Sequence, residues 1–485
     1  MYRKKPSGQL EFEEFYHPFG GKLSSDNRWV KLSKLLPWEE IERRYEKSFS
    51  QKMGAPAKPL RMALGALIIK ERCGFTDEET VEQIRENPYL QYFIGLKAYT
   101  DEAPFNPSTM VYFRMRIGLE IIDEINEMIV TGDRRNDESN IADPDNDDEN
   151  NVNDGDNGGD NNGKLIIDAT CTPADIRYPT DLSSLNEGRE KLEKIIDVLH
   201  EPLKGKEKKP RTYRQKARKA YLKTAKKRKR TQKEIRKAIG KQLGYVSRDL
   251  RHVEELVKRS SLELLSRYQY KCLLVIQELY RQQKKMYDAR EHSVENRIVS
   301  ISQPHIRPIV RGKVSAPTEF GAKISLSPVD GFARIEKFSW ETFNESTTLQ
   351  EEIERYKSRH GFYPVSVHVD KIYRTRRNIG YCKKNNIRIS GPPLGRPRKD
   401  DNEELRIKQE KQDLRERVLI EGKIGEGKRR YSMARIMAKL PDTSESVIGI
   451  IFLVMNLEKK LRLLFVRFLL RFVSRNLWRH EGLSA

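Results

Sequence analysis

Residues 164–170 read KLIIDAT and residues 363–370 read YPVSVHVD, so that two short apolar runs each lead directly into an aspartate. Runs of this length are typical of buried β-strands. Because ligands in open α/β sheets bind outside the carboxyl ends of the strands, we expect Asp168 and Asp370 to lie side by side. Two carboxylates that close repel each other and need a compensating cation, for which the oxygen-preferring Mg²⁺ or Mn²⁺ is the natural choice. Either aspartate alone is more often a strand-end cap.

A third acidic residue lies on a predicted helix, LRERVLIEGKIGEGKRRYSMARIMAKL at 414–440. Arg417, Glu421 and Lys428 are spaced i, i+4 and i+11, which places them within roughly 60° on one helical face. A carboxylate for a metal ion beside two cations for phosphate suits phosphodiester chemistry. Taken alone, Arg417 and Glu421 form an ordinary surface ion pair.

The pattern around these acids predicts a mixed sheet flanked by helices. Residues 164–181 suggest a first hairpin, with a turn and a return strand in CTPADIRYPTD. Residues 320–326 and 333–338, joined by a turn at Asp330 and Gly331, suggest a second hairpin. Strand and helix then alternate, with a helix at 351–359. Strands that precede such alternation indicate an α/β class.

Residues 1–130 are predicted to form a helical domain. A helix in PLRMALGALIIKERCG ends at Gly74, a capping pattern of Thr76 and Glu79 begins a second, and a third begins near Ser108. Short helices with a basic last helix fit a helix-turn-helix that reads a DNA groove. A helical domain that only packs explains the pattern equally well.

Two further segments are unusual in charge. Residues 133–163 contain eleven acids and two arginines, which predicts an unstructured acidic linker at 131–163. A long helical insertion is expected at about 185–296. Within it, residues 204–241 contain 19 Lys or Arg against Glu207 and Glu234. Charge of this kind follows phosphates without reading sequence, whereas a solvated helical face is the alternative.

The whole composition agrees with a polyanionic partner. The formal net charge is +22, which favours nucleic acid through counterion release, although a ribosomal or membrane-surface protein has a similar charge.

The four cysteines form no CxxC pair, so neither a zinc finger nor a disulfide framework is expected. The first residues lack the apolar core of a signal peptide, and the apolar run 447–457 is too short to cross a bilayer. These features predict a cytoplasmic protein.

The order and the sequences of these motifs resemble those of the bacterial insertion-sequence transposases with an RNase H-like DDE domain. The resemblance covers nearly the whole chain and rests on IIDATCTPADIRYPTD, PHIRPIVRGK, FGAKISLSPVDGF, VHVDKIYRTRRN and IEGKIGEGKRRYSMARIMAKL. It implies an RNase H-like catalytic domain at 164–475, followed by a tail at 476–485. Arg417, Glu421 and Lys428 match the family's Tyr-x2-Arg-x3-Glu-x6-Lys signature, in which Leu414 replaces the tyrosine.

The resemblance also implies functions for individual residues. Asp168, Asp370 and Glu421 are expected to be the catalytic acids and to hold two Mg²⁺ or Mn²⁺ ions. Double-stranded DNA, as transposon ends and target, is the expected partner, bound by a homodimer near the bacterial nucleoid. The residues expected to contact DNA are Arg417, Lys428, Arg307, Arg311, Lys313, Arg374 and Arg377.

Two other functions remain open at this point. A nuclease of the same fold would cut DNA without joining it. A DNA-binding protein derived from a transposase would have lost catalysis, although the presence of all three acids argues against this. The apolar stretches 447–457 and 461–473 are expected to form helices that serve either dimer contacts or core packing.

Overall fold

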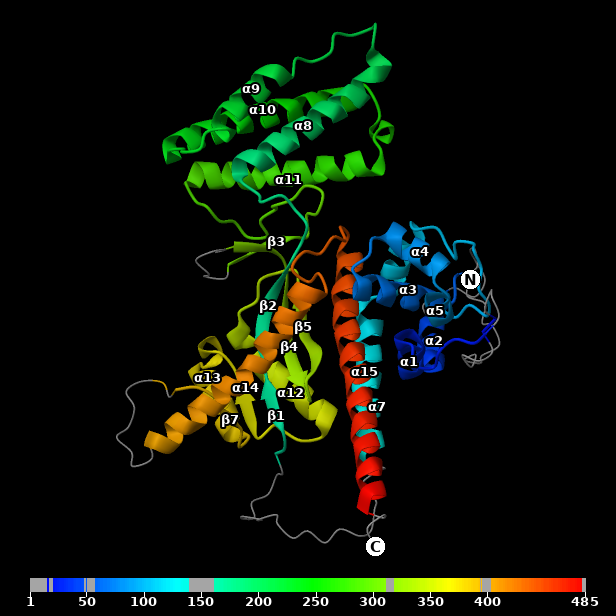
Figure 1. Cartoon of the computed structure of the whole chain (residues 1–485). Helices are drawn as coiled ribbons and strands as arrows, with labels where there is room; N and C mark the ends of the chain where they lie inside the picture. Colours follow the sequence, from blue (N-terminus) through cyan, green and yellow to red (C-terminus); the bar gives the residue numbers. More distant parts are fainter. Residues whose placement is uncertain are drawn as a thin grey trace. The chain divides into compact units, whose positions relative to one another are not determined.

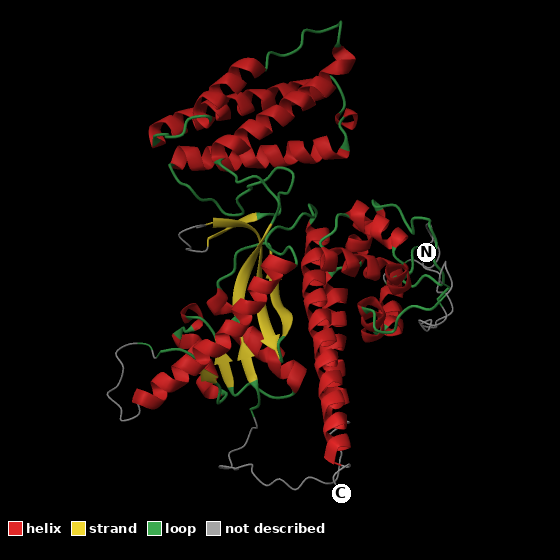
Figure 2. Cartoon of the chain, in the orientation of Figure 1, coloured by secondary structure: helices red, strands yellow, loops and turns green. Residues whose placement is uncertain are grey.

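The structure is a computed structural model that describes residues 15–16, 21–47, 49, 57–138, 161–310, 318–392, 394 and 403–481. The described residues form two compact units. Unit 1 comprises Met1–Thr172, Ile324–Phe338 and Phe343–Ala485, and unit 2 comprises Pro173–Lys323 and Ser339–Thr342. Figures 1 and 2 show the elements of both units.

Unit 1 combines helices with most of the strands. Its helices are α1 (Arg28–Leu35), α2 (Trp38–Glu46), α3 (Leu60–Cys73), α4 (Asp77–Glu86), α5 (Pro88–Phe93), α6 (Thr109–Arg116), α7 (Leu119–Glu138), α12 (Leu349–His360), α13 (Arg376–Lys384), α14 (Glu403–Arg430) and α15 (Pro441–Glu481). Two short 3₁₀ helices, η4 (Glu345–Thr347) and η5 (Lys371–Tyr373), lie next to each other.

The strands form a parallel sheet and an antiparallel sheet. In the parallel sheet, β6 (Ser366–His368) lies between β1 (Lys164–Ile166) and β7 (Arg388–Ile389), with Leu165 opposite Val367. In the second sheet the order is β2 (Asp168–Pro173), β4 (Thr318–Val329) and β3 (Arg307–Val310), and β5 (Phe332–Ser339) also pairs with β4. The predicted α/β class is therefore confirmed.

The first predicted hairpin is wrong. β1 and β2 follow each other with only Ile167 between them, and the Ile167 N–H donates to the His368 carbonyl at 3.0 Å. After Pro173 the chain leads to the next helix without returning along β2. One extended segment therefore serves both sheets, and Asp168 stands where it passes from one sheet to the other.

The second predicted hairpin is confirmed as β4 and β5. Its turn residues Asp330 and Gly331 both have positive φ angles, of 51° and 73°. Two consecutive residues with positive φ define the turn type that matches the twist of paired antiparallel strands.

The predicted helix boundaries at Gly74, Thr76 and Ser108 agree with the ends of α3, α4 and α6. Gly74 ends α3 with a φ of 71°, and the Thr76 side chain accepts a hydrogen bond from the Glu79 N–H at the start of α4. On α6, Arg114 is only 7% exposed and forms an ion pair with Asp77 at 2.6 Å. That arginine therefore stabilises the fold and is not on the surface.

The two apolar C-terminal stretches belong to one continuous helix, α15. Its segment 447–457 is buried against α3, α6 and α7, and Figure 1 shows α7 and α15 side by side. A Cβ on Gly449 would lie 2.9 Å from Leu119, so glycine permits this close approach. Core packing thus accounts for segment 447–457.

Unit 2 is mainly helical, as predicted for the insertion. Its elements are α8 (Asp181–His200), η2 (Glu201–Leu203), α9 (Arg214–Ala225), α10 (Gln232–Val257), η3 (Leu262–Leu264) and α11 (Arg267–Ala289), together with β3 and the first residues of β4. Leucine and isoleucine side chains of α8, α10 and α11, with Cys272, form its apolar core.

Parts of the sequence predictions lie outside the described residues. The description stops at Glu138, within α7, and resumes at Asn161, so most of the predicted linker 131–163 falls outside it. Among the residues that are described, no helix has the combined length and apolarity that a bilayer crossing requires.

Asp249 in the core of unit 2 makes stability depend on pH. The pKa of Asp249 is raised to about 7, mainly by burial and also by Glu193, whereas Arg189, Arg248 and Arg214 oppose the shift. Because the unfolded carboxyl has a pKa of about 4, the ionised group destabilises the folded state progressively from about pH 4 to pH 7. We expect Asp249→Asn to raise the melting temperature at pH 8 more than at pH 5, by several degrees, since ~1 kcal/mol corresponds to roughly 2–4 °C.

The matched control is Asp288→Asn, which changes an exposed aspartate of α11 that pairs with Lys284. Thermal melts of both variants and the wild type at the two pH values measure the effect. An equal shift for Asp249→Asn at pH 5 and pH 8 would show that the carboxyl does not titrate in this range.

Candidate functional site

Asp168 is the first residue of β2 and is partly buried at the junction of the two sheets. Its side chain accepts a hydrogen bond from the Ala169 N–H at 2.8 Å. Burial raises the pKa of the Asp168 carboxyl. The charges of Glu345 and Asp370 raise it further, while the Ala169 N–H and Arg417 lower it. The charge of Asp370 therefore acts on the Asp168 carboxyl.

Asp370 lies two residues after β6, at the start of η5, and is 55% exposed. Its carboxylate accepts a hydrogen bond from the Lys371 N–H at 2.7 Å. The Arg417 guanidinium lies 3.7 Å from the same carboxylate. Arg417 thus supplies positive charge to both aspartates from the helix that carries the third predicted acid.

Helix α14 is held on the parallel sheet by polar side chains. Asp413, which is buried, accepts two hydrogen bonds from Arg388 of β7, at 2.7 and 2.9 Å. Glu416 forms an ion pair with Lys164 of β1 at 2.6 Å and lies 3.3 Å from the fully buried His368 of β6. These contacts hold the helix to all three strands of the sheet (Figure 1).

Glu421 and Lys428 lie farther along α14. Glu421 is exposed, one helical turn beyond Arg417, and Lys428 is partly buried in the last turn. Across the described part of the chain, no three His, Cys, Asp or Glu side chains stand close enough to hold a metal ion. The structure thus brings Asp168 and Asp370 together with Arg417, but it does not bring in Glu421 as a third ligand.

Glu345 is a site residue that the sequence analysis missed. It begins η4, which lies against η5 next to Asp370, and its charge acts on Asp168 more strongly than that of Asp370 does. It comes from the loop WETFNES, where no strand or helix periodicity marks it. Only the three-dimensional arrangement reveals this acid.

The other basic residues predicted to contact DNA have different surroundings. Arg374 donates to the Ile389 carbonyl at 3.0 Å, so it supports the end of β7. Arg377 is exposed on α13. Arg307, in unit 2, donates to the Pro304 carbonyl at 2.6 Å and pairs with Glu341. Arg311 and Lys313 lie outside the described residues.

The residues of the site fit a hard divalent cation in their donor chemistry. Asp168, Asp370 and Glu345 offer only carboxylate oxygens, the donors that Mg²⁺ and Mn²⁺ prefer. Burial and the charges of Glu345 and Asp370 raise the pKa of Asp168, and Arg417 opposes this shift.

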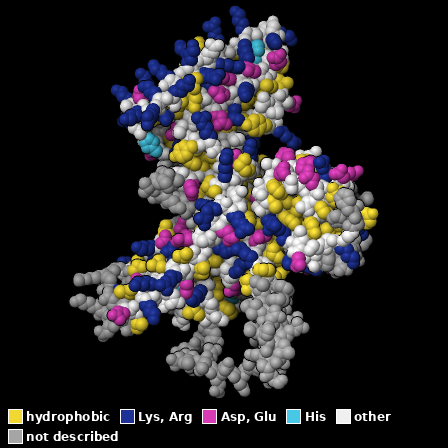
Figure 3. All heavy atoms as spheres, viewed as in Figure 1, with side chains coloured by type: hydrophobic (Ala, Val, Ile, Leu, Met, Phe, Trp, Pro, Cys, Tyr) yellow, Lys and Arg dark blue, Asp and Glu magenta, His cyan; other side chains and the backbone are white. Residues whose placement is uncertain are grey.

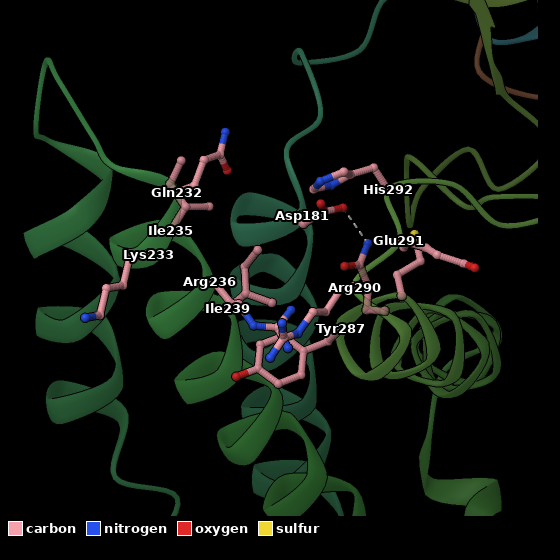
Figure 4. A pocket seen from close by; sticks show the side chains of 12 residues that line it. Asp181, Gln232, Lys233, Ile235, Arg236, Ile239, Tyr287, Arg290, Glu291 and His292 are labelled. Carbon is pink, nitrogen blue, oxygen red and sulfur yellow. Dashed lines mark hydrogen bonds between the residues drawn. The ribbon is translucent and has the colours of Figure 1, made fainter.

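A separate hollow of about 630 Å³ lies within unit 2 (Figure 4). The first turns of α10 and the last turn of α11 line it, with Lys233, Arg236 and Arg290 among its residues. The Arg236 guanidinium lies 4.2 Å from the centre of the Tyr287 ring. None of the predicted acids lies there, so the hollow is distinct from the acidic site.

Comparisons with known proteins match two parts of the chain. Residues 367–458 match the family described as transposase DDE domain, and residues 17–116 match the transposase domain called DUF772. The first match includes Asp370, Arg417, Glu421 and Lys428 but begins after Asp168.

One curated relative and no solved structure add to these matches. The chain is similar to the uncharacterized protein ORF8 in the nfe locus of Rhizobium meliloti, with 35% identity over 96 residues. That alignment covers 20% of this chain and 46% of that protein, so the chain spans about half the length of the curated relative. No solved structure matches.

The docking of α14 can be tested at Arg388. Arg388→Ala leaves the buried Asp413 carboxylate without its guanidinium partner, which we expect to cost about 1–3 kcal/mol. Hydrogen exchange should then become faster in α14 while α7 and α15 stay protected. The control is Arg415→Ala, an exposed arginine on the same helix. Equal exchange of α14 in the two variants would contradict the proposed role of this ion pair.

Proposed function

Because this chain belongs to the insertion-sequence DDE transposases, we propose that it cuts DNA at the ends of an insertion sequence and joins those ends to target DNA. The catalytic carboxylates in this proposal are Asp168, Asp370 and Glu421. The observation that carries it is the convergence of Asp168 and Asp370 on Arg417, one helical turn from Glu421. An RNase H-like catalytic fold and the Tyr-Arg-Glu-Lys branch of the family are part of the proposal.

The chemistry consists of two displacements at phosphorus. In the first, a water oxygen bonds to the phosphorus at the element's end, and the leaving 3′ oxygen becomes a hydroxyl. In the second, that hydroxyl oxygen bonds to a target phosphorus, and the 3′ oxygen of the target strand leaves. Two divalent ions, when bound, would polarise the phosphate and increase the acidity of the attacking water or hydroxyl.

The side chains of the chain have separate functions in these steps. Asp168, Asp370 and Glu421 would hold the divalent ions. Arg417 and Lys428 would position DNA phosphates through charge-assisted hydrogen bonds. Arg377 and the basic residues near Arg307, including Arg311 and Lys313, would extend the DNA contact. Arg374 contributes by supporting the end of β7.

Two DNA ends must be held together for joining, so we propose that a homodimer forms on DNA. The exposed apolar side chains Leu464, Phe465 and Val466 on α15 offer a contact outside the buried segment 447–457. A nuclease that cuts without joining is the second candidate, since the same acids serve both reactions.

A strand-transfer assay tests the catalytic proposal. With a duplex that carries the element's own end and a supercoiled target, we expect Mg²⁺-dependent cleavage followed by joined product. Asp168→Asn, Asp370→Asn and Glu421→Gln should each lower cleavage by about 100-fold or more, whereas Glu404→Gln, an exposed acid on α14, should not. Cleavage without joined product would favour the nuclease, and undiminished cleavage by Asp168→Asn would rule out the proposed site.

Glu345 provides a second, independent test. If its carboxylate contributes to the metal site, Glu345→Gln should raise the Mg²⁺ concentration required for half-maximal cleavage by about 10-fold or more. The maximal rate at saturating Mg²⁺ should fall much less. An unchanged Mg²⁺ dependence would restrict Glu345 to a structural role in η4.

A further inference from the structure

We propose that the helical insertion in unit 2 binds duplex DNA of arbitrary sequence through a basic face formed by α9, the turn 226–230 and the first half of α10. The inference rests on the proposed function, because that function supplies DNA as the partner. It adds a second DNA-binding surface, made of residues outside the acidic site.

The α9 side of the basic face is a stripe of lysines. Lys216, Lys219, Lys223 and Lys226 follow one another at helical spacing, so they lie within about 80° of one another around the helix axis. All four are exposed. The fully buried Ala217 is on the side that faces the other helices. The stripe is therefore the outer face of α9.

The α10 side repeats this arrangement. Lys233, Lys237 and Lys241 are spaced i, i+4 and i+8 and are exposed, whereas Ala238 and Gln242 are buried on the opposite side. α9 and α10 pack against each other. The turn between them, 226–230, consists entirely of Lys and Arg, so it joins the two stripes into one surface.

Little negative charge lies within this surface. In residues 204–241 the only acids are Glu207 and Glu234. Glu234 already caps α10 through Thr231 and pairs with Lys227, and Glu207 pairs with Arg259. Figure 3 shows Lys and Arg side chains gathered over this part of the insertion.

The fold of unit 2 does not depend on these lysines. The basic residues that stabilise it are others: Arg214 pairs with Asp197, and Arg236 lies over the Tyr287 ring. The stripe lysines face away from the apolar core and repel one another. A surface that costs stability in this way is explained by an anionic partner.

The chemistry of the face favours the phosphate backbone over the bases. Lysine is a mobile point charge without the planar fork of arginine, and contacts to phosphate fix position but carry no sequence information. Successive stripe lysines are separated by about 4.5–6 Å along the helix axis. A surface of this kind suits target DNA, whose sequence varies from one insertion to the next.

The experiment measures binding of the full chain to a random-sequence duplex in EDTA, as a function of salt. The variant replaces Lys216, Lys219, Lys223, Lys233 and Lys237 with glutamine. Each phosphate contact that is lost should reduce the slope of log affinity against log salt by about 0.9. We expect the slope to fall by about 3–4 and the affinity at 0.1 M salt to fall about tenfold or more.

The matched control makes the same change in net charge elsewhere in unit 2. It replaces the exposed residues Arg251, Lys258, Arg267, Lys271 and Lys285 with glutamine. Its slope should stay within about one unit of the wild type. Equal slopes for the two variants would overturn the proposal, and so would tighter binding of wild type to duplex RNA of the same length. Thermal melts verify that both variants fold.

The same titration in an Asp168→Asn background separates this inference from the proposed function. If the slope change persists there while cleavage is absent, the basic face binds DNA independently of catalysis. If the chain cleaves and joins DNA but the lysine variant binds as tightly as the wild type, the proposed function stands and this inference fails.

Discussion

The docking of α14 on the parallel sheet is the constraint on which the acidic site depends. Asp168 and Asp370 are positioned by strands, whereas this helix brings Arg417 to the Asp370 carboxylate. A buried aspartate bonded to Arg388 and a glutamate bonded to Lys164 hold the helix at β7 and β1. Such contacts are directional and fix the rotation of a helix more closely than apolar packing does, because a shift would leave Asp413 buried without its partner.

A second constraint links the helices of unit 1 to its sheets. Asn456 of α15 is 1% exposed, and its amide exchanges two hydrogen bonds with the backbone of Ala333 in β5, each of 2.8 Å. Its amide nitrogen also reaches Asn126 of α7 at 3.1 Å. One side chain thereby satisfies the backbone groups of a strand and ties two helices to it. This explains a polar residue in the most apolar segment of the chain, since an unpaired Ala333 amide would be costly there.

The sequence predicted those features that depend on local pattern. Short-range rules account for the positions of Asp168 and Asp370, each two residues after a strand of the parallel sheet. They also account for the turn at Asp330 and Gly331 and for the helix end at Gly74. The errors concern features set by tertiary contacts. The return strand after Pro173 does not form because β2 pairs with β4, which is about 150 residues farther along the chain. Glu345 went unnoticed because its position depends on the packing of η4 against η5.

The insertion separates the residues that fold it from the residues that carry its charge. Aliphatic side chains and Cys272 form the apolar core of α8, α10 and α11, so the exposed lysines are not needed to hold these helices together. The exposed lysines of α9 and α10 could be exchanged for other polar residues without loss of core contacts. Even so, nearly all the charged residues of this segment are basic. A solvated helical face without a charged partner is expected to carry both acids and bases. Such mixed charges are found on α12, where Arg355 pairs with Glu351, and on α14, where Arg406 pairs with Glu410. The excess of positive charge on the insertion is therefore explained by an anionic binding partner and not by the stability of the fold.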